Sequence, residues 1–296
     1  MNTSPLMLND DLKNLVYQSI SDAASLDTFS HTELDPLHWC SPEGKMLRSA
    51  IVYAVAGNHT DPAVTDCAAA VHLIHSASLI LDDIHDSDTV RHLKPSCWVI
   101  TGTNQAMNLG NFLFTSALKL LMNTQTDAQT RLSLVSKAVE CIGHMIEGQM
   151  MDLHFSDSNR SSDYYMRCIR GKTGALFGLS YILPAILMGV EPTIRKTATE
   201  HFTDLGSAYQ LSDDIIDMEG RKETRQKNSD ILRGRCTIAS CVPFVNEGLP
   251  TVINFMDEYL RTINQKALEL PVIVQELSSE FNAMFLNRSS DRFYKL

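Results

Sequence analysis

Residues 66–86 read DCAAAVHLIHSASLILDDIHD, and this stretch decides the expected fold. Its apolar residues recur at three- and four-residue steps, which is the period of a helix with one buried face. Residues 135–153 and 198–218 follow the same period, whereas alternating runs typical of β-strands are scarce. Breaks between elements are expected at 58–62, 93–103, 155–163 and 219–235. We therefore predict an all-α fold, a single domain over residues 1–296 built as a bundle of about ten or more helices.

The composition is that of a globular protein with a large core. Of 296 residues, 44% are hydrophobic and 20% are charged, which argues against extensive disorder. The net charge is −10, from 25 Lys and Arg against 35 Asp and Glu, and no basic patch stands out, so nucleic acid is not an expected partner. Such an acidic chain needs divalent cations or local basic residues to bind an anionic substrate.

Three features indicate a cytoplasmic protein without a transmembrane segment. The seven cysteines are odd in number and form no CxxC pair, which favours reduced thiols over disulfides or a zinc site. Residues 1–10 lack the basic and apolar regions of a signal peptide. The apolar stretch at 174–190 contains Ser180, Tyr181 and Pro184, so a buried helix, kinked or ended at the proline, is the better interpretation.

Two aspartate clusters stand inside otherwise apolar segments. Both read DDxxD, and their members are Asp82, Asp83 and Asp86, and Asp213, Asp214 and Asp217. On a helix, positions i and i+4 lie on one face, so the first and last aspartates of each cluster should stack at a cost in helix stability. Mg²⁺ would offset this repulsion, because it prefers oxygen ligands and binds through carboxylates together with substrate phosphate. For either cluster alone, a solvated acidic helix end remains an equal alternative.

Basic residues suited to a diphosphate lie near both clusters. They are Lys45 and Arg48, Arg91 and His92, Lys172 beside Thr173, and Arg233 and Arg235. Each alone is a weak signal because surface Lys and Arg are common, but a diphosphate needs cations at fixed positions. His75 lies about two helical turns before Asp82 on the same face, where a core role and a binding role fit equally well.

Taken together, these residues resemble the trans-isoprenyl diphosphate synthases, the head-to-tail polyprenyl synthase family. The matching pieces, within residues 41–237, are GKMLRS, HSASLILDD, DDIHD with Arg91 after it, GQMMDL, GKTGALF, YQLSDDIID and SDILRGRCT. The resemblance implies an all-α fold around a deep central cavity, usually as a homodimer. It also implies a Mg²⁺-dependent condensation of isopentenyl diphosphate with an allylic diphosphate.

The resemblance also implies roles for single residues. The six aspartates would hold Mg²⁺, roughly three ions per active site. Arg91, Lys172 and Arg235 would contact the allylic diphosphate, and Lys45, Arg48 and His75 would hold isopentenyl diphosphate. Thr173 and Gln210 match positions near the developing carbocation. The expected catalytic residues are thus Asp82, Asp83, Asp86, Lys172, Thr173, Gln210 and Asp213.

The chain departs from the family pattern at two places. Arg91-His92-Leu93 stands where the family usually has Arg-Arg-Gly, so His92 takes the place of an arginine that helps to bind isopentenyl diphosphate. Arg235 replaces a lysine, and another loop lysine has no clean match, although Arg225 or Lys227 would serve. Two alternatives therefore stay open: a class I terpene cyclase, and a non-catalytic helical subunit that modulates a synthase.

The residues before the first cluster bear on product length. In the family, bulky aromatic side chains four and five positions before the cluster stop growth at C15, and here these positions hold Ser78 and Ala77. The small side chains favour geranylgeranyl diphosphate, C20, with C15 as the other option. Phe112 and Phe114 are candidates for the cavity floor.

Overall fold

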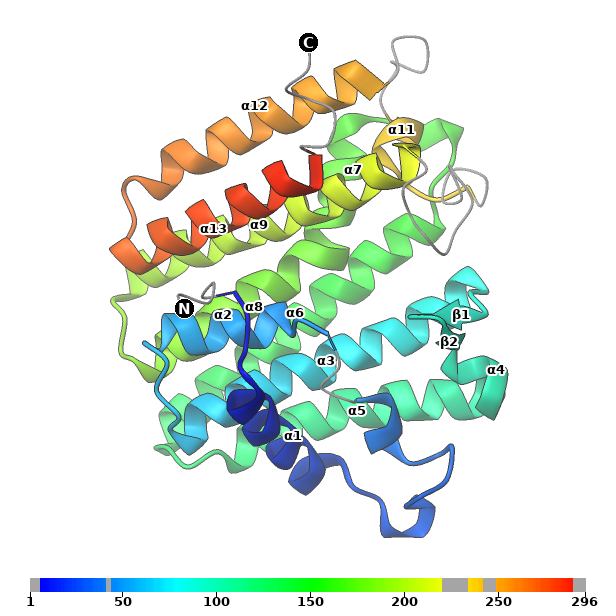
Figure 1. Ribbon diagram of the computed structural model, residues 1–296, viewed down its shortest axis with the longest axis vertical. Helices are drawn as coiled ribbons and strands as arrows, with labels where there is room; N and C mark the ends of the chain where they lie inside the picture. Colours follow the sequence, from blue (N-terminus) through cyan, green and yellow to red (C-terminus); the bar gives the residue numbers. More distant parts are fainter. Residues whose placement is uncertain (1–5, 41–43, 220–233, 242–248, 290–296) are drawn as a thin grey trace. The chain divides into compact units, whose positions relative to one another are not determined.

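The computed structural model describes residues 6–40, 44–219, 234–241 and 249–289 (Figure 1), without the side chains of residues 249 and 286–289. Every secondary-structure element among the described residues is helical except one short hairpin, so the predicted all-α fold is confirmed. The α-helices are α1 (Asp10–Ala24), α2 (Leu47–Val55), α3 (Pro62–Asp86), α4 (Cys97–Thr101), α5 (Thr103–Asn123), α6 (Ala128–Leu153), α7 (Ser162–Ile169), α8 (Ala175–Leu187), α9 (Pro192–Glu219), α11 (Ile238–Cys241), α12 (Leu249–Ala267) and α13 (Val272–Ser289). The shorter elements are η1 (Asp27–Phe29), η2 (Pro36–Trp39), η3 (Asp157–Asn159), the π-helical turn η4 (Arg170–Gly174), and the strands β1 (Val90–Arg91) and β2 (Lys94–Pro95).

Contacts within the chain group it into two compact units. Unit 1 comprises residues 1–139 and 179–190, and unit 2 comprises residues 140–178 and 191–296. The boundaries fall inside α6 and α8, so both helices contribute to both units. The expected single domain remains a prediction.

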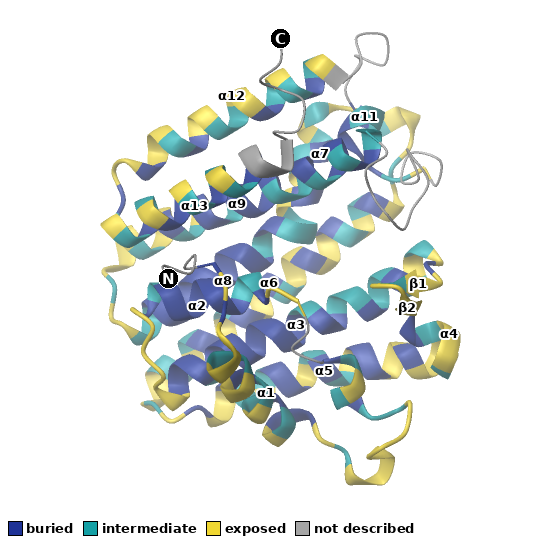
Figure 2. Cartoon of the chain, in the orientation of Figure 1, coloured by how far each residue is buried: buried dark blue, intermediate teal, exposed yellow. Residues whose placement is uncertain are grey.

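Helix α3 is the centre of unit 1, and most of its length is buried (Figure 2). Asp61 caps its first turn by accepting a hydrogen bond from the backbone of Ala63, and Pro62 occupies the first helical position, where a missing N–H costs nothing. The helix passes α5 in the antiparallel sense. A Cβ added at Gly110 would lie 2.8 Å from Cγ of Leu81, and Oγ1 of Thr124 donates to Asp66 over 3.1 Å. These two contacts fix the register between α3 and α5.

Apolar composition gives only weak evidence for a membrane span. Among the described residues, α3 is the one helix that is long and apolar enough to cross a bilayer, and 72% of its apolar window is buried. A core helix passes the same test of length and composition. The apolar stretch at 174–190 contains the whole of α8, which does not end at Pro184 but continues to Leu187. All seven cysteines are buried free thiols.

Helix α9 is the centre of unit 2 and approaches η4 and α8 closely. A Cβ at Gly174 would lie 2.6 Å from the carbonyl oxygen of Thr203, and one at Gly178 would lie 2.5 Å from Oγ1 of the same threonine. Helix α13 packs on α9 through a 2.6 Å hydrogen bond between Nε2 of His201 and Oγ of Ser278. Only glycine permits the first two approaches, so these positions set how η4 and α8 lie on α9.

The buried imidazole of His201 should make unit 2 sensitive to acid. Burial lowers its pKa from 6.5 to about 4. The unfolded chain therefore binds a proton that the folded chain excludes between these values, and stability is lost as the pH falls. Between pH 7 and pH 5 this term amounts to about 2 kcal/mol. Urea unfolding at both pH values should show wild type losing that much more stability than His201→Gln, and equal losses would contradict a neutral His201.

Candidate functional site

The first aspartate cluster forms the last turn of α3. Asp83 is buried, and Nε of Arg91 donates to both of its carboxylate oxygens over 2.8 and 2.9 Å. Burial raises the pKa of Asp83, aided by the charges of Asp82 and Asp88 and opposed by Arg91. The carbonyl groups at a helix C-terminus carry partial negative charge, so carboxylates there are disfavoured unless a cation offsets them. This end of α3 is therefore built for positive charge.

A two-residue hairpin places Arg91 over the cluster. Val90 pairs with Pro95 and Arg91 with Lys94, and the turn between the strands consists of His92 and Leu93. Both turn residues have positive φ, 51° and 64°, as the tight turn of a hairpin requires. Leu93, which is 81% exposed, thus occupies a backbone conformation that favours glycine, the residue expected there from the family pattern.

The second cluster lies near the end of α9, and its middle aspartate is fully engaged. The Oδ2 atom of Asp214 accepts from the Tyr165 hydroxyl over 2.9 Å and from the Ile238 backbone N–H over 3.2 Å. The Oδ1 atom accepts from Nε2 of Gln210 over 3.0 Å. Burial and the charge of Asp214 raise the pKa of Tyr165 well above its usual value, so the hydroxyl stays protonated and donates. Asp213 is half-buried and Asp217 is buried.

Both clusters thus share one internal pattern. The second aspartate is held by protein donors, while the first and fifth are stacked one helical turn apart. Among the described residues, no group of three or more His, Cys, Asp or Glu side chains could hold a metal ion. Mg²⁺ usually takes one or two carboxylates and completes its shell with water and substrate phosphate, so the first and fifth aspartates of a cluster are the residues that could hold it. The Oδ1 atoms of Asp82 and Asp86 are buried oxygens that accept no hydrogen bond, although both side chains have other interactions.

A third carboxylate, which the sequence did not single out, organises the basic residues of unit 2. Asp152 is buried at the end of α6, and its Oδ2 accepts from Nζ of Lys172 over 2.7 Å. Its Oδ1 accepts from the backbone N–H of Cys236 over 2.9 Å. Arg235 directly precedes Cys236, so one carboxylate fixes both predicted diphosphate-binding positions. The matched piece GQMMDL contained this residue, but spacing alone gave it no role.

The π-helical turn η4 carries Lys172 and Thr173. Its defining bond runs from the N–H of Ala175 to the carbonyl of Arg170, and such turns often mark functional sites. Oγ1 of Thr173 donates to Oε1 of Gln210 over 2.9 Å, which links η4 to the second cluster through Gln210. The turn lies backbone to backbone on α6, since a Cβ at Gly148 would lie 2.1 Å from the nitrogen of Lys172.

The residues predicted to hold isopentenyl diphosphate lie around the start of α2. Lys45 is exposed, and Arg48 lies in the first helical turn with Nη1 3.2 Å from Nε2 of His75. Burial, followed by the charge of Arg48, lowers the pKa of His75 well below its ordinary value, so the neutral ring accepts a hydrogen bond from the guanidinium. The structure therefore brings Arg48 and His75 together.

Within unit 1 the structure brings Arg91 to the first cluster, and within unit 2 it brings Lys172, Thr173, Gln210 and Arg235 to the surroundings of the second. Arg225, Lys227 and Arg233 lie outside the described residues. The central cavity and the joint use of both clusters stay predictions.

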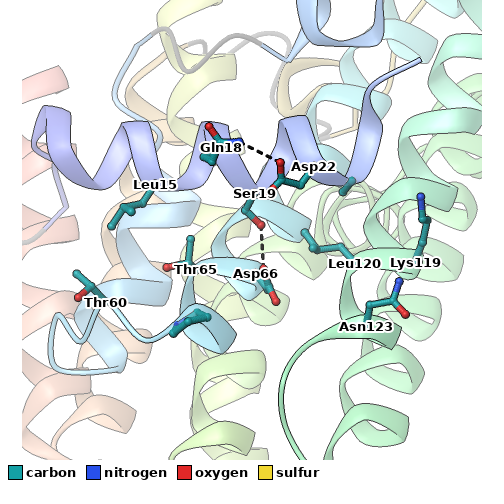
Figure 3. Close-up of a pocket in the computed structure, with 12 residues that line it drawn as sticks. Leu15, Gln18, Ser19, Asp22, Thr60, Thr65, Asp66, Lys119, Leu120 and Asn123 are labelled. Atoms are coloured by element: carbon teal, nitrogen blue, oxygen red, sulfur yellow. Dashed lines mark hydrogen bonds between the residues drawn. The ribbon is translucent and has the colours of Figure 1, made fainter. Parts of the chain in front are cut away.

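A pocket of about 390 Å³ lies elsewhere in unit 1, between α1, α3 and α5 (Figure 3). Ser19, Asp66 and Lys119 are among its lining residues, and Ser19 donates to Asp66 over 2.9 Å. Asp66 precedes Asp82 by sixteen residues, about 24 Å along a helix, so this pocket is separate from the aspartate cluster. The carboxylates that line this pocket accept hydrogen bonds from protein donors, and the pocket is not part of the candidate diphosphate site.

A family model described as Polyprenyl synthetase matches residues 35–271, most of the chain. The chain belongs to the polyprenyl synthetase family. Among curated members of this family, it is 29% identical over 206 residues to a geranylgeranyl pyrophosphate synthase of Geoglobus acetivorans, covering 68% of this chain and 64% of the relative. It is 34% identical over 179 residues to a short chain isoprenyl diphosphate synthase of Methanocaldococcus jannaschii, covering 59% and 54%. These alignments span less than two thirds of both relatives.

Other members of the polyprenyl synthetase family are named for longer products. The octaprenyl diphosphate synthase of Escherichia coli is 28% identical over 235 residues, 78% of this chain and 71% of the relative. Among solved structures, the geranylgeranyl pyrophosphate synthetase of Geoglobus acetivorans superimposes with a TM-score of 0.76 at 23% identity, over 92% of this chain and 96% of that one. This likeness establishes the fold of the family.

Proposed function

We propose that the chain is a Mg²⁺-dependent prenyltransferase that condenses isopentenyl diphosphate head to tail with an allylic diphosphate. The observation that carries the proposal is the internal pattern shared by both DDxxD clusters, each with a protein-held second aspartate and a stacked first and fifth pair. Family membership supports the same chemistry. A solvated acidic helix end would not need its middle carboxylate to be buried and saturated with donors.

Of the six aspartates expected to hold Mg²⁺, we assign direct ligation to Asp82, Asp86, Asp213 and Asp217, because protein donors bind the other two. Asp83 and Asp214 would orient the clusters through Arg91 and Tyr165. Bound Mg²⁺, roughly three ions per site, would neutralise the leaving diphosphate so that its C–O bond can ionise. Both clusters would bind the same metal–diphosphate complex.

The basic residues divide between the two substrates. Lys172 and Arg235, tied to Asp152, would contact the allylic diphosphate together with Arg91. Lys45, Arg48 and His75 would hold isopentenyl diphosphate, with His92 beside them. The Thr173 hydroxyl and the Gln210 amide oxygen would face the developing positive charge, because oxygen dipoles placed in advance stabilise it without reorganisation.

The α3–α5 register selects the floor residue for the proposed C20 product. Leu81 lies opposite Gly110, so one turn further along the antiparallel pair Ala77 lies level with Phe114. Phe112 is two positions from Phe114 and points to a different side of α5. We therefore propose Phe114 as the side chain that limits the growing prenyl chain.

Substitutions at these positions should change product length in opposite directions. Ala77→Phe is expected to shift the main product from C20 to C15 or shorter, because the ring fills the space beside the growing chain. Phe114→Ala should lengthen it by at least one isoprene unit. Phe112→Ala is the matched control and should leave the distribution unchanged. Chromatography of radiolabelled products sizes each one, and a longer product from Phe112→Ala would assign the floor to the wrong residue.

We propose a homodimer formed through α6. Exposed apolar side chains follow one stripe of this helix: Leu132, Val139, Ile146, Met150 and Leu153, which are 48% to 64% exposed. Their spacing of seven, seven, four and three residues places them on a single face, which a second copy of the chain would cover. Ile146→Glu should yield a monomer in sedimentation velocity, and a dimer unchanged by it would rule out this face.

An assay with labelled isopentenyl diphosphate tests the function. The chain is incubated with Mg²⁺ and dimethylallyl or farnesyl diphosphate, with and without the labelled substrate. The proposal expects diphosphate release only when all three components are present. Hydrocarbon from geranylgeranyl diphosphate alone would indicate a terpene cyclase, and activity that appears only on mixing with another synthase would indicate a modulating subunit.

A further inference from the structure

We propose that the ion pair between Arg170 and Asp204 is a positioning pair that holds the π-helical turn η4, and with it Lys172 and Thr173, in the geometry the reaction needs. Neither Arg170 nor Asp204 lies in the sequence motifs that match the family. The inference rests on the proposed function for its kinetic consequences, whereas its structural part stands on the contacts of unit 2 alone.

Asp204 is an anchor inside unit 2. Its side chain on α9 is 11% exposed, and the Arg170 guanidinium, from the first residue of η4, pairs with its Oδ1. Nζ of Lys266 lies 3.4 Å from Oδ2, and the Tyr259 hydroxyl lies 3.4 Å from Oδ1. Lys266 and Tyr259 both come from α12. One carboxylate therefore joins η4 to α9 and α12.

The turn η4 depends on such an anchor because neighbouring residues contact different helices. Gly171 and Lys172 contact α6, through Gly148 and Asp152, whereas Thr173 contacts Gln210 on α9. A π-turn contains one more residue than an α-helical turn, and its hydrogen bonds are less favourable. Relaxation to an α-helix would rotate the following side chains by about 100°, which would break the contacts of either Lys172 or Thr173.

Arg170 is the charged contact that opposes this relaxation at the start of the turn. Arg170 and Thr173 both reach α9, through Asp204 and Gln210, while Lys172 reaches α6. With the guanidinium removed, Asp204 keeps its contacts to α12 and the link to η4 is lost. Among the side-chain contacts described for the turn, those of Lys172 with Asp152 and of Thr173 with Gln210 would remain, and these are the groups proposed to meet the substrates.

Steady-state kinetics of Arg170→Gln give the functional test. Misplacement of catalytic groups by a fraction of an ångström to 1 Å lowers rates by about 10- to 100-fold, so kcat should fall by that factor. The KM for isopentenyl diphosphate should change less than about twofold, because Arg48 and His75 are untouched. Arg170→Lys keeps the charge and should restore most of kcat. Lys266→Gln is the matched control, since it removes a cation from the same carboxylate without touching η4, and it should leave kcat near wild type.

Amide hydrogen exchange gives a readout independent of activity. In Arg170→Gln the amides of residues 171–175 should exchange at least about tenfold faster than in wild type. The exchange rates of α9 amides that are distant from Asp204 should stay the same. Exchange of residues 171–175 at the wild-type rate would overturn the proposal. So would a fall in kcat that is fully explained by a smaller folded fraction, or an equal fall in kcat in Lys266→Gln. A wild type without prenyltransfer would refute the proposed function, and the exchange comparison would still decide whether the pair holds the turn.

Discussion

Asp82→Asn is expected to lower turnover by more than about a thousandfold. The substitution keeps the size of the side chain and removes the negative charge with which Asp82 is proposed to bind Mg²⁺ at the end of α3. Metal charge stabilises a leaving diphosphate by several kcal/mol, and a thousandfold loss corresponds to about 4 kcal/mol. The measurement is the rate of diphosphate release at saturating Mg²⁺ and both substrates.

Asp66→Asn is the matched control on the same helix. Asp66 is bound by Ser19 and Thr124 far from the cluster, so its substitution should affect stability rather than turnover. The fold of Asp82→Asn should stay intact, because removing one charge from the last turn of α3 relieves repulsion. An Asp82→Asn enzyme with more than a tenth of the wild-type rate would contradict its role as a metal ligand.

Gly148→Ala is expected to disrupt the site from the side of α6. The added methyl would lie 2.1 Å from the Lys172 nitrogen and 2.7 Å from the Gly171 carbonyl carbon, distances that backbone atoms cannot tolerate. Helix α6 and η4 must separate, at a cost of about 3 kcal/mol or more in the free energy of unfolding. Lys172 would lose Asp152, so turnover should fall by at least about a hundredfold.

Gly143→Ala provides the control within the same helix. No atom lies within 4 Å of a Cβ built at Gly143, and alanine in a helix interior is favoured over glycine by roughly 0.5–1 kcal/mol. Gly143 lies four residues after Val139, on the α6 face proposed to contact a second copy, so the variants are compared at equal oligomeric state by sedimentation velocity. At equal oligomeric state, Gly143→Ala should be as stable as wild type or more so, with full activity. Thermal unfolding and initial rates are measured for both alanine variants. Equal unfolding temperatures and equal rates would mean that the close approach at Gly148 does not position Lys172.

Helix periodicity and the DDxxD motifs predicted much of what the structure shows. The segments at 66–86, 135–153 and 198–218 lie within α3, α6 and α9, because long amphipathic patterns are a local property of the chain. The pairing partners of the aspartates were not predictable in this way. Tyr165 and Asp214 are 49 positions apart, and no spacing rule connects them. Asp152 was missed for the same reason, since its role appears only when η4 is folded against α6.

The hairpin after the first cluster shows another limit of sequence reasoning. In the sequence, Arg91-His92-Leu93 indicates a change in charge, with His92 in place of an arginine. The structure shows that it is also a change in backbone, because Leu93 takes a left-handed conformation that glycine adopts without strain. The choice between Phe112 and Phe114 likewise needed the register between α3 and α5, which only tertiary contacts define.

The central claim is that the two aspartate clusters bind one metal–diphosphate complex, and a binding cycle tests it most directly. The affinity of an unreactive allylic thiodiphosphate in the presence of Mg²⁺ is measured by calorimetry for wild type, Asp82→Asn, Asp213→Asn and the double variant. If both clusters hold the same complex, each single substitution weakens binding by at least about a hundredfold, and the double variant loses much less than the product of the two. Losses that multiply, or an Asp213→Asn variant that binds as tightly as wild type, would contradict the claim.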